Sequence, residues 1–488
     1  MNASLLILAL TVASFLLGFL RDLFIAEAFG LSWEADLIFV ALILPLFFEN
    51  FLGLALRDAM IPYLQKLRGQ SESLFQAVAT WLYWRVAGLG LAVCVVASAA
   101  SYWLLSALAP GWSAAQVDAG QLVFCVGTLL IAVQAVLYCQ GALLNMEGVF
   151  VMPMTRTVLL NAGAIVGILL LEPTGMVIFV GMLLPQLGLI AVQHRRIGYV
   201  GRRHQARTTG RGGEFGLAFA PVLLAAGAQQ ACILAERMFA SFLQEGSITM
   251  LSFAFRIVTI PLTLYAMSIL AVLFPRFVES WERGDHDEHG ATVRKGLLAT
   301  LLFLVPAAVV LCSFPEAVVQ VLLERGEFGD AQTAATATLV AAYGIGLPAM
   351  GFALLWGRAL LAQHRARLFL IVMLASSGLT IVLDALLLRP FGAEGLAVAF
   401  SAGAVAQALL MGFFVYRTSP AGFGFPLLAR WLGIAAVVGG VLHYLPKPGG
   451  FIELCLYIGA VLVAFVLGLG ALGERDLFRP AYWSMKKG

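Results

Sequence analysis

Charged residues are scarce in this chain. Asp, Glu, Lys and Arg make up 12% of its 488 residues, whereas 61% are hydrophobic and the mean hydropathy is +0.94. A soluble domain is about half apolar and about a quarter charged, and it uses those charges to cover its surface. The composition therefore excludes a large soluble domain and indicates that lipid surrounds most of the fold.

Strict alternation of apolar and polar residues is also missing, which excludes a transmembrane β-barrel. Instead, apolar runs of about 20 residues, enough for a helix to cross about 30 Å of hydrocarbon, recur from end to end. We expect spans at 3–30, 35–64, 78–108, 117–146, 152–171, 175–194, 215–243, 248–275, 292–313, 332–360, 366–388, 394–416, 427–445 and 451–472.

Motifs of catalysis are absent as well. The sequence has no phosphate-binding Gly-Lys loop, no HExxH and no nucleophile elbow, and its six cysteines show no paired spacing. The polar run Gly284–Gly290 is more typical of a solvated loop than of a metal site, since consecutive residues cannot all converge on one ion. We expect no enzyme, no metal and no cofactor other than a coupling ion, Na⁺ or H⁺.

Lys and Arg are distributed unevenly over the predicted loops. Twenty of the thirty lie on one side, three on the other and seven inside spans. The positive-inside rule then places both termini and the basic loop from His194 to Arg211 in the cytoplasm of a bacterium.

The two halves of the chain share a register. Arg21, Gly30 and Pro45 recur as Arg237, Gly246 and Pro261, each 216 residues later. A repeat of six helices has an even number of crossings, so both copies enter the membrane from the same side. We therefore predict an all-α integral membrane protein of about fourteen transmembrane helices, with two parallel six-helix lobes around a central cavity plus two C-terminal helices. The expected domains are an N-lobe at 1–197, a linker at 198–214, a C-lobe at 215–420, and the last two helices with a tail at 421–488.

Several charges fall inside the predicted spans, where each costs about 2.5–3.5 kcal/mol and normally faces a wet cavity or a partner. Adjacent helical residues point about 100° apart, so neither Arg21 and Asp22 nor Glu236 and Arg237 should close on each other. Their partners would lie in the other lobe or in an anionic cargo such as a diphosphate, which arginine binds in a bidentate way. Purely stabilising ion pairs remain the alternative. The candidate substrate-binding residues are Arg21, Asp22, Asp36, Arg57, Arg237 and Arg256.

Three further arginines lie near span ends and are expected to snorkel to the interface. They are Arg85, Arg156 and Arg358.

Four segments resemble the MurJ (MviN) lipid II flippases of the multidrug/oligosaccharidyl-lipid/polysaccharide exporter superfamily. They are LLGFLRDLFIAEAFGLSWEADLIFVALILP from Leu16, MIPYL from Met60, AFRIVTIP from Ala254, and LLERGEFGDAQTAATATLVAAYGIGLPAMGFALL from Leu322. The resemblance implies two six-helix lobes, a cationic cavity, two extra helices beside a groove for a polyprenyl tail, and alternating access. It places Arg21, Asp22, Asp36 and Arg256 at charged cavity positions. The family sometimes has a sodium ion near helices seven, eleven and twelve, to which Glu236 and Asp384 could contribute; two cavity-lining acids unrelated to coupling are the alternative.

Other positions depart from the family pattern. Phe15 replaces an arginine, the charged motif of helix two is lost around Glu49 to Ala55, and the turn after helix ten reads QHRARLF from Gln363. Because these losses affect head-group recognition, the sequence favours a flippase for an undecaprenyl-diphosphate-linked exopolysaccharide repeat over lipid II. A lipid II flippase is the alternative.

Two other classes remain open, a cation-coupled drug exporter and a membrane glycosyltransferase or polymerase. An arginine-rich cavity argues against the former, and the short outer loops argue against the latter. The expected partners are the lipid-linked glycan, the bilayer, and the glycosyltransferases and polymerase of the same pathway, with no nucleic acid.

Overall fold

The computed structural model describes residues 3–49, 54–200, 230–419 and 425–471. Within these ranges the side chains of 3–5, 8, 54–59, 62, 425–428, 443 and 469–471 are not described. The described chain is almost entirely helical, and its one β-bridge joins Arg325 to Phe328. Ten of its helices are long and apolar enough to cross a membrane. The predicted all-α membrane fold is confirmed.

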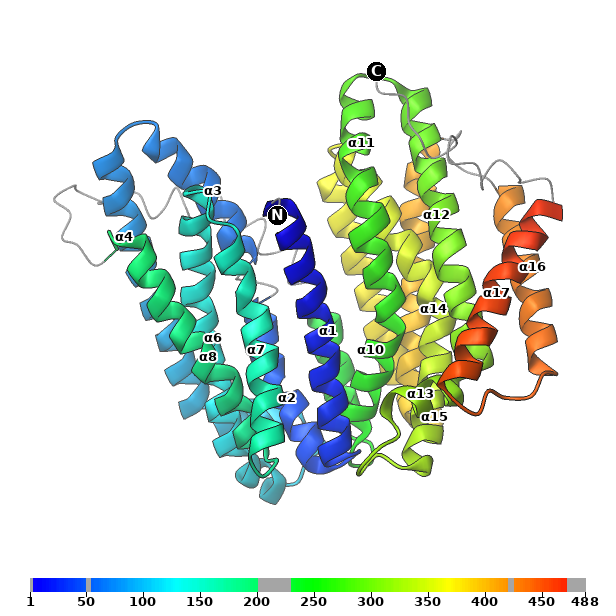
Figure 1. Ribbon diagram of the computed structural model, residues 1–488, viewed down its shortest axis with the longest axis horizontal. Helices are drawn as coiled ribbons and strands as arrows, with labels where there is room; N and C mark the ends of the chain where they lie inside the picture. The colour runs from blue at the N-terminus through cyan, green and yellow to red at the C-terminus, as the bar shows by residue number, and fades with distance from the viewer. Residues whose placement is uncertain (1–2, 50–53, 201–229, 420–424, 472–488) are drawn as a thin grey trace. The chain divides into compact units, whose positions relative to one another are not determined.

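The chain forms two compact units, shown in Figure 1 with the chain coloured from blue to red along the sequence. Unit 1 comprises Met1–Thr249 together with Arg325–Phe328, and unit 2 comprises Met250–Glu324 and Gly329–Gly488. Residues 230–249, expected in the C-lobe, cluster with unit 1. The expected linker lies outside the described residues except for 198–200, so the domain boundaries stay a prediction.

Unit 1 is built from eight labelled helices, followed by a helix at 230–240. The labelled helices are α1 (Ala3–Phe29), α2 (Trp33–Phe48), α3 (Leu54–Arg68), α4 (Glu72–Ala99), α5 (Ser101–Leu108), α6 (Ala114–Met146), α7 (Val151–Leu170) and α8 (Gly175–Ile197). Helix α6 is central, because α2, α3, α4 and α8 all pack on it. Buried residues of α3, α4 and α6 form an apolar core with Tyr199 and Val200 just beyond α8.

Unit 2 continues with α10, a π-helical segment η2 and seven further helices. They are α10 (Ser247–Tyr265), η2 (Ala266–Leu270), α11 (Ala271–Glu282), α12 (His286–Ser313), α13 (Pro315–Leu323), α14 (Asp330–Ala362), α15 (Ala366–Thr418), α16 (Phe425–His443) and α17 (Phe451–Ala471). Helix α15 is two spans joined at a kink, since Gly392 has φ 57° and ψ −135°. Helices α16 and α17 pack against α12 (Figure 1).

Each of the fourteen expected spans has a helical counterpart among the described residues. The second span consists of α2 and α3, the eighth runs on through η2 into α11, and the two halves of α15 are the eleventh and twelfth. The seventh is described only at 230–240.

The sequence repeat reappears in local structure. Gly30 follows α1 with φ 56°, and Gly246 precedes α10 with φ 84°, so both hairpin turns use the left-handed conformation that glycine adopts readily. Pro45 lies in α2 and Pro261 in α10, and each helix is interrupted soon afterwards, α2 at Glu49 and α10 at η2. Proline removes a helical donor and π segments commonly occur at functional bends, which accounts for both interruptions.

Candidate functional site

Arg21 and Asp22 lie buried in the C-terminal half of α1, and the two side chains do bind each other. Nε and Nη2 of Arg21 contact Oδ1 of Asp22 at 3.0 and 2.6 Å. The expectation that adjacent helical residues could not close on each other was wrong here. A guanidinium on four rotatable bonds folds back along the helix surface and reaches its neighbour, so the angle between Cβ vectors does not limit it.

The remaining end of the Arg21 guanidinium is held by α7. Nη1 donates to Oδ1 of Asn161 at 3.1 Å, and the Asn161 amide in turn donates to the carbonyl of Ser14 at 3.3 Å. Gly18 lies beside that amide, and a Cβ there would be in ordinary contact with Nδ2 at 3.4 Å. Guanidinium has five N–H donors, and these bonds use three of them. Arg21 is therefore a rigidly oriented cation with donors remaining for an anion.

Asp36 lies on the first turn of α2, and its carboxylate binds backbone rather than arginine. One oxygen accepts a hydrogen bond from the Gly246 N–H at 2.8 Å, and the other accepts from the N–H and the hydroxyl of Thr249, both at 2.7 Å. Asp36 is buried, and the positive charge of Arg237 acts on its carboxylate. In this conformation Asp36 fastens the turn before α10 to the start of α2.

The other predicted charges fall on both units. In the helix at 230–240, Glu236 is buried and Nη1 of Arg237 donates to the carbonyl of Ile248 at 2.6 Å. In unit 2, Arg256 is half-buried on α10 and Asp384 is fully buried on α15. Arg57 belongs to α3, but its side chain lies outside the described residues. A cavity shared by these charges stays a prediction, as does the sodium site.

The sequence analysis missed a buried polar cluster around Arg156, which was wrongly expected to snorkel to the interface. Nη2 of Arg156 forms an ion pair with Glu49 at 2.9 Å and contacts the Tyr138 hydroxyl at 2.9 Å. Its Nη1 binds Gln134, and its guanidinium lies 4.3 Å from the centre of the Tyr138 ring. The side chains of Arg156 and Glu49 are only 12% and 18% exposed. The position of Arg156 near a span end suggested snorkelling. The sequence alone does not show that Glu49, at the end of another helix, faces this arginine.

The other two arginines expected to snorkel are exposed, as that expectation requires. Arg85 lies over the ring of Trp81, and Arg358 lies over that of Phe274.

An apolar groove of about 760 Å³ runs between α16 and α17 in unit 2. Aliphatic residues of both helices line it, among them Ile434, Val437 and Val461, and Arg430 is the charged residue in its lining. A Cβ at Gly433 would meet nothing within 4 Å, so this wall is open. An apolar groove with a cation in its lining is complementary to an isoprenoid chain attached to a phosphate.

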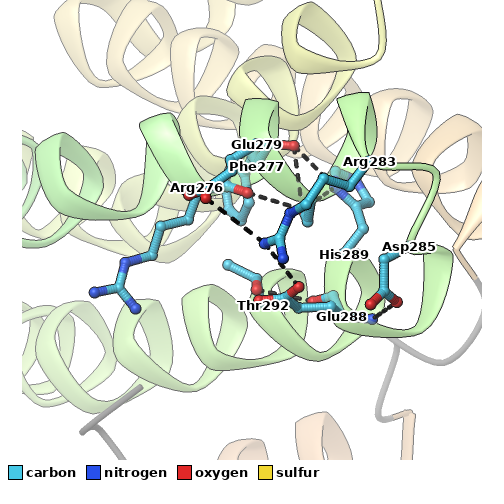
Figure 2. Close-up of polar contacts among 9 residues, drawn as sticks. Arg276, Phe277, Glu279, Arg283, Asp285, Glu288, His289 and Thr292 are labelled. Carbon is cyan, nitrogen blue, oxygen red and sulfur yellow. Dashed lines mark hydrogen bonds and ion pairs between the residues drawn. The ribbon is translucent and has the colours of Figure 1, made fainter. Parts of the chain in front are cut away.

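The polar run at 284–290 serves the structure of the α11–α12 turn (Figure 2). Asp285 caps α12 by accepting from the Glu288 N–H at 2.8 Å, and Arg283 pairs with Glu288 at 2.9 Å. The buried His289 ring bonds the Phe277 carbonyl and the Ser280 hydroxyl, each at 3.2 Å. Among the described residues no group of three or more His, Cys, Asp or Glu side chains could hold a metal ion.

Together, these observations define a multi-pass helical membrane protein with a buried, oriented cation in unit 1 and an apolar groove in unit 2. Comparison with known proteins then specifies the family. The model of the family "Lipid II flippase MurJ" matches residues 25–448, and the chain belongs to this family. Such proteins are transporters rather than catalysts of a chemical reaction, and they lie in the inner membrane.

Relatives match over most of the chain. The lipid II flippase MurJ of Burkholderia cenocepacia is 24% identical over 472 residues, covering 91% of this chain and 89% of the relative. The probable lipid II flippase MurJ of Thermotoga maritima is 26% identical over 407 residues, or 81% of each chain.

Two solved structures show the shared fold. A lipid II flippase MurJ in an inward closed conformation has a TM-score of 0.84 at 21% identity and covers 97% of this chain and all of its own. An inward-facing multidrug transporter of the MATE family, within the MOP superfamily, has a TM-score of 0.68 at 12% identity and covers 84% and 95%.

Proposed function

We propose that this protein flips lipid II, an undecaprenyl-diphosphate-linked sugar–peptide, from the cytoplasmic to the periplasmic leaflet. The family match supports the cargo, and the oriented Arg21 is the structural observation on which the proposal rests. A diphosphate leaves water only where fixed cations replace its hydration. Arg21 is buried, held by Asp22 and Asn161, and still has donors for phosphate oxygens.

The groove between α16 and α17 suits the other end of the same molecule. An undecaprenyl chain needs apolar contact along its length, and Ile434, Val437 and Val461 provide it beside Arg430. Gly433→Phe places a ring on the groove wall at a position where the Cβ itself meets nothing within 4 Å. Gly440→Phe is the matched control, because Gly440 lies on the same helix, has the same open surroundings and does not line the groove. We expect the first change to reduce flipping and the second to leave it unchanged.

A flippase for an exopolysaccharide repeat is the second candidate. Phe15 and the segment from Glu49 to Ala55 depart from the cationic pattern of the family, and in the structure the Glu49 carboxylate is paired with Arg156. Both cargos share the undecaprenyl diphosphate, so they differ in the sugar and in the peptide that lipid II carries. The shared fold is the only support for drug export, and a buried arginine is unfavourable for cationic drugs.

Complementation separates the two cargos. The chain should restore growth to a bacterium depleted of its own lipid II flippase, and external labelling should detect lipid II in the outer leaflet. Restoration of polymer export in a strain that lacks an exopolysaccharide flippase, without rescue of growth, would instead establish the second candidate.

The proposal also includes an ion that drives transport and the orientation of the chain in the membrane. Glu236 and Asp384 are the buried acids that we assign to a coupling ion, Na⁺ or H⁺, and both termini are assigned to the cytoplasm. Flipping in vesicles should then respond to an ionophore that collapses the gradient of that ion, and charge-neutral variants of either acid should lose this response. The glycosyltransferases and polymerase of the pathway stay predicted partners.

A further inference from the structure

The segment Arg325–Phe328 belongs to unit 1, although α13 before it and α14 after it belong to unit 2. It is the RGEF part of the RGEFG stretch, and the cargo sites described above do not account for it. The turn is tight, because the Phe328 N–H donates to the Arg325 carbonyl at 3.0 Å. Gly326 has φ 56° at the second position, where a turn of this hand favours glycine.

This turn completes the C-terminal end of α1. The last four carbonyls of a helix have no partner within it, and Glu27 lies in the last turn of α1. The Glu327 N–H donates to the Glu27 carbonyl at 2.9 Å, so a residue 300 positions later caps the helix. A Cβ on Gly326 would lie 2.4 Å from the same carbonyl, and only glycine allows this approach.

The burial of Phe328 shows that the turn is anchored and not merely adjacent. Phe328 is 1% exposed, and so a large aromatic side chain anchors it. Beyond the turn, Gly329 has an ordinary φ of −99° and open space where a Cβ would be. The contact of the turn with α1 therefore depends on Gly326 and Phe328, while the connection from the turn to α14 has free space around it.

A second glycine turn packs on the same hairpin of unit 1. Gly246 lies so close to Leu31 that its Cβ would be 2.5 Å from the Leu31 carbonyl, and Asp36 binds the N–H groups on either side of this turn. The outer ends of α1 and α2 thus receive two turns from later parts of the chain, each through backbone contact at a glycine of positive φ.

We propose that Arg325–Phe328 is a strap that holds the outer side of the transporter closed and must leave α1 when that side opens. The strap is covalently continuous with α13 and α14, so a rearrangement of unit 2 pulls on it directly. The hydrogen bond from the Glu327 N–H to the Glu27 carbonyl joins two backbone groups, and water can take the place of the Glu327 N–H at the end of α1. This proposal rests on the transport function and on the predicted orientation of α1, but not on the identity of the cargo.

Release of the strap is tested by labelling in a cysteine-free background. Ile248→Cys is a reporter, because Ile248 is fully buried beside the Asp36 contacts. We expect Gly326→Ala and Phe328→Ala each to increase its reaction with a membrane-impermeant maleimide added outside intact cells. Gly329→Ala is the matched control in the same loop and should leave the labelling at the parental level. Unchanged labelling in both strap variants would overturn the proposal.

Locking of the strap tests the same idea without loss of packing. A disulfide between Glu27→Cys and Glu327→Cys should stop complementation of a deletion strain, and a membrane-permeant reductant should restore it. Each single cysteine variant is the control. Full transport by the quantitatively cross-linked protein would show that the strap need not move. Because labelling of Ile248→Cys requires no cargo, its outcome is independent of whether lipid II is the substrate.

Discussion

The carboxylate of Asp36 receives both the N–H and the hydroxyl of Thr249 at 2.7 Å on a single oxygen, Oδ1. The other oxygen takes the Gly246 N–H, so the acid is satisfied by groups that carry no charge. Asn at this position places an amide N–H₂ against at least one of these donors. We expect Asp36→Asn to weaken transport without ending it and to destabilise the protein by about 2 kcal/mol. Thermal unfolding in detergent beside complementation measures both effects, and an Asn variant with unaltered stability would contradict this account.

The head-group site is tested at Arg21 and Arg256, which the repeat places on equivalent hairpins of the two halves. Arg21→Ala and Arg256→Ala should each abolish transport while the protein still inserts and accumulates, because the diphosphate loses a cation that replaces its hydration. Lysine should rescue only in part, since it keeps the charge and loses the planar fork. The readout is complementation beside a membrane-fraction immunoblot.

Arg358→Ala is the control for these variants, because Arg358 is exposed and stacks on Phe274. Full transport by the double variant Arg21→Ala, Arg256→Ala would show that the cargo is recognised elsewhere.

Cysteines at Ser32 and Ser247 should cross-link and trap the inward-facing state. Ser32 caps α2 by accepting from the Ala35 N–H, and Ser247 opens α10 directly after the glycine turn that contacts Leu31. Transport should stop on oxidation and return on reduction. A cross-linked protein that still transports would rule out opening at this hairpin.

Topology is tested at position 204, in the basic loop after α8 that lies outside the described residues. A cysteine there should resist an impermeant maleimide added to intact cells and react once the membrane is permeabilised, as the positive-inside rule requires. Reaction from outside would reverse the orientation of the whole chain.

The Arg156–Glu49 pair should stabilise the fold, whereas an arginine that snorkels to the interface would contribute little. Removing one member leaves a buried charge without its partner, so Arg156→Met should cost about 3 kcal/mol or more. The double variant Glu49→Met, Arg156→Met should cost less than Arg156→Met alone. Unfolding temperatures of the three proteins give the coupling between the two residues, and additive losses would show that the pair is not coupled.

The sequence predicted the helices well, because long apolar runs in a bilayer have only one way to satisfy their backbone hydrogen bonds. The repeat of Pro45 as Pro261 was also visible in the sequence, and in the structure both prolines lie inside helices, α2 and α10. Side-chain partners were harder. A span shows that Arg156 is in the membrane, but only the packing of α2 on α6 and α7 on α6 brings Glu49 within reach.

The partners of Asp36 could not be predicted from the sequence either. Its position in a span indicated a functional charge, whereas its contacts are with backbone N–H groups more than 200 residues later. Backbone partners have no residue signature, so no pattern in the sequence could have named Gly246 or Thr249. The same holds for the Glu327 N–H on the Glu27 carbonyl, although the RGEFG stretch itself was recognisable.

The placement of Arg325–Phe328 within unit 1 has a mechanical consequence. A force applied to the C-terminus draws α17, α16, α15 and α14 out of the membrane in turn before it reaches Phe328. The next anchor is then the buried ring of Phe328 and the Glu27 carbonyl in the other unit, while α13 and α12 of unit 2 are still in place. Unit 2 therefore cannot be extracted as one cooperative block, and a single-molecule pulling trace should show an added force peak between the removal of α14 and that of α12.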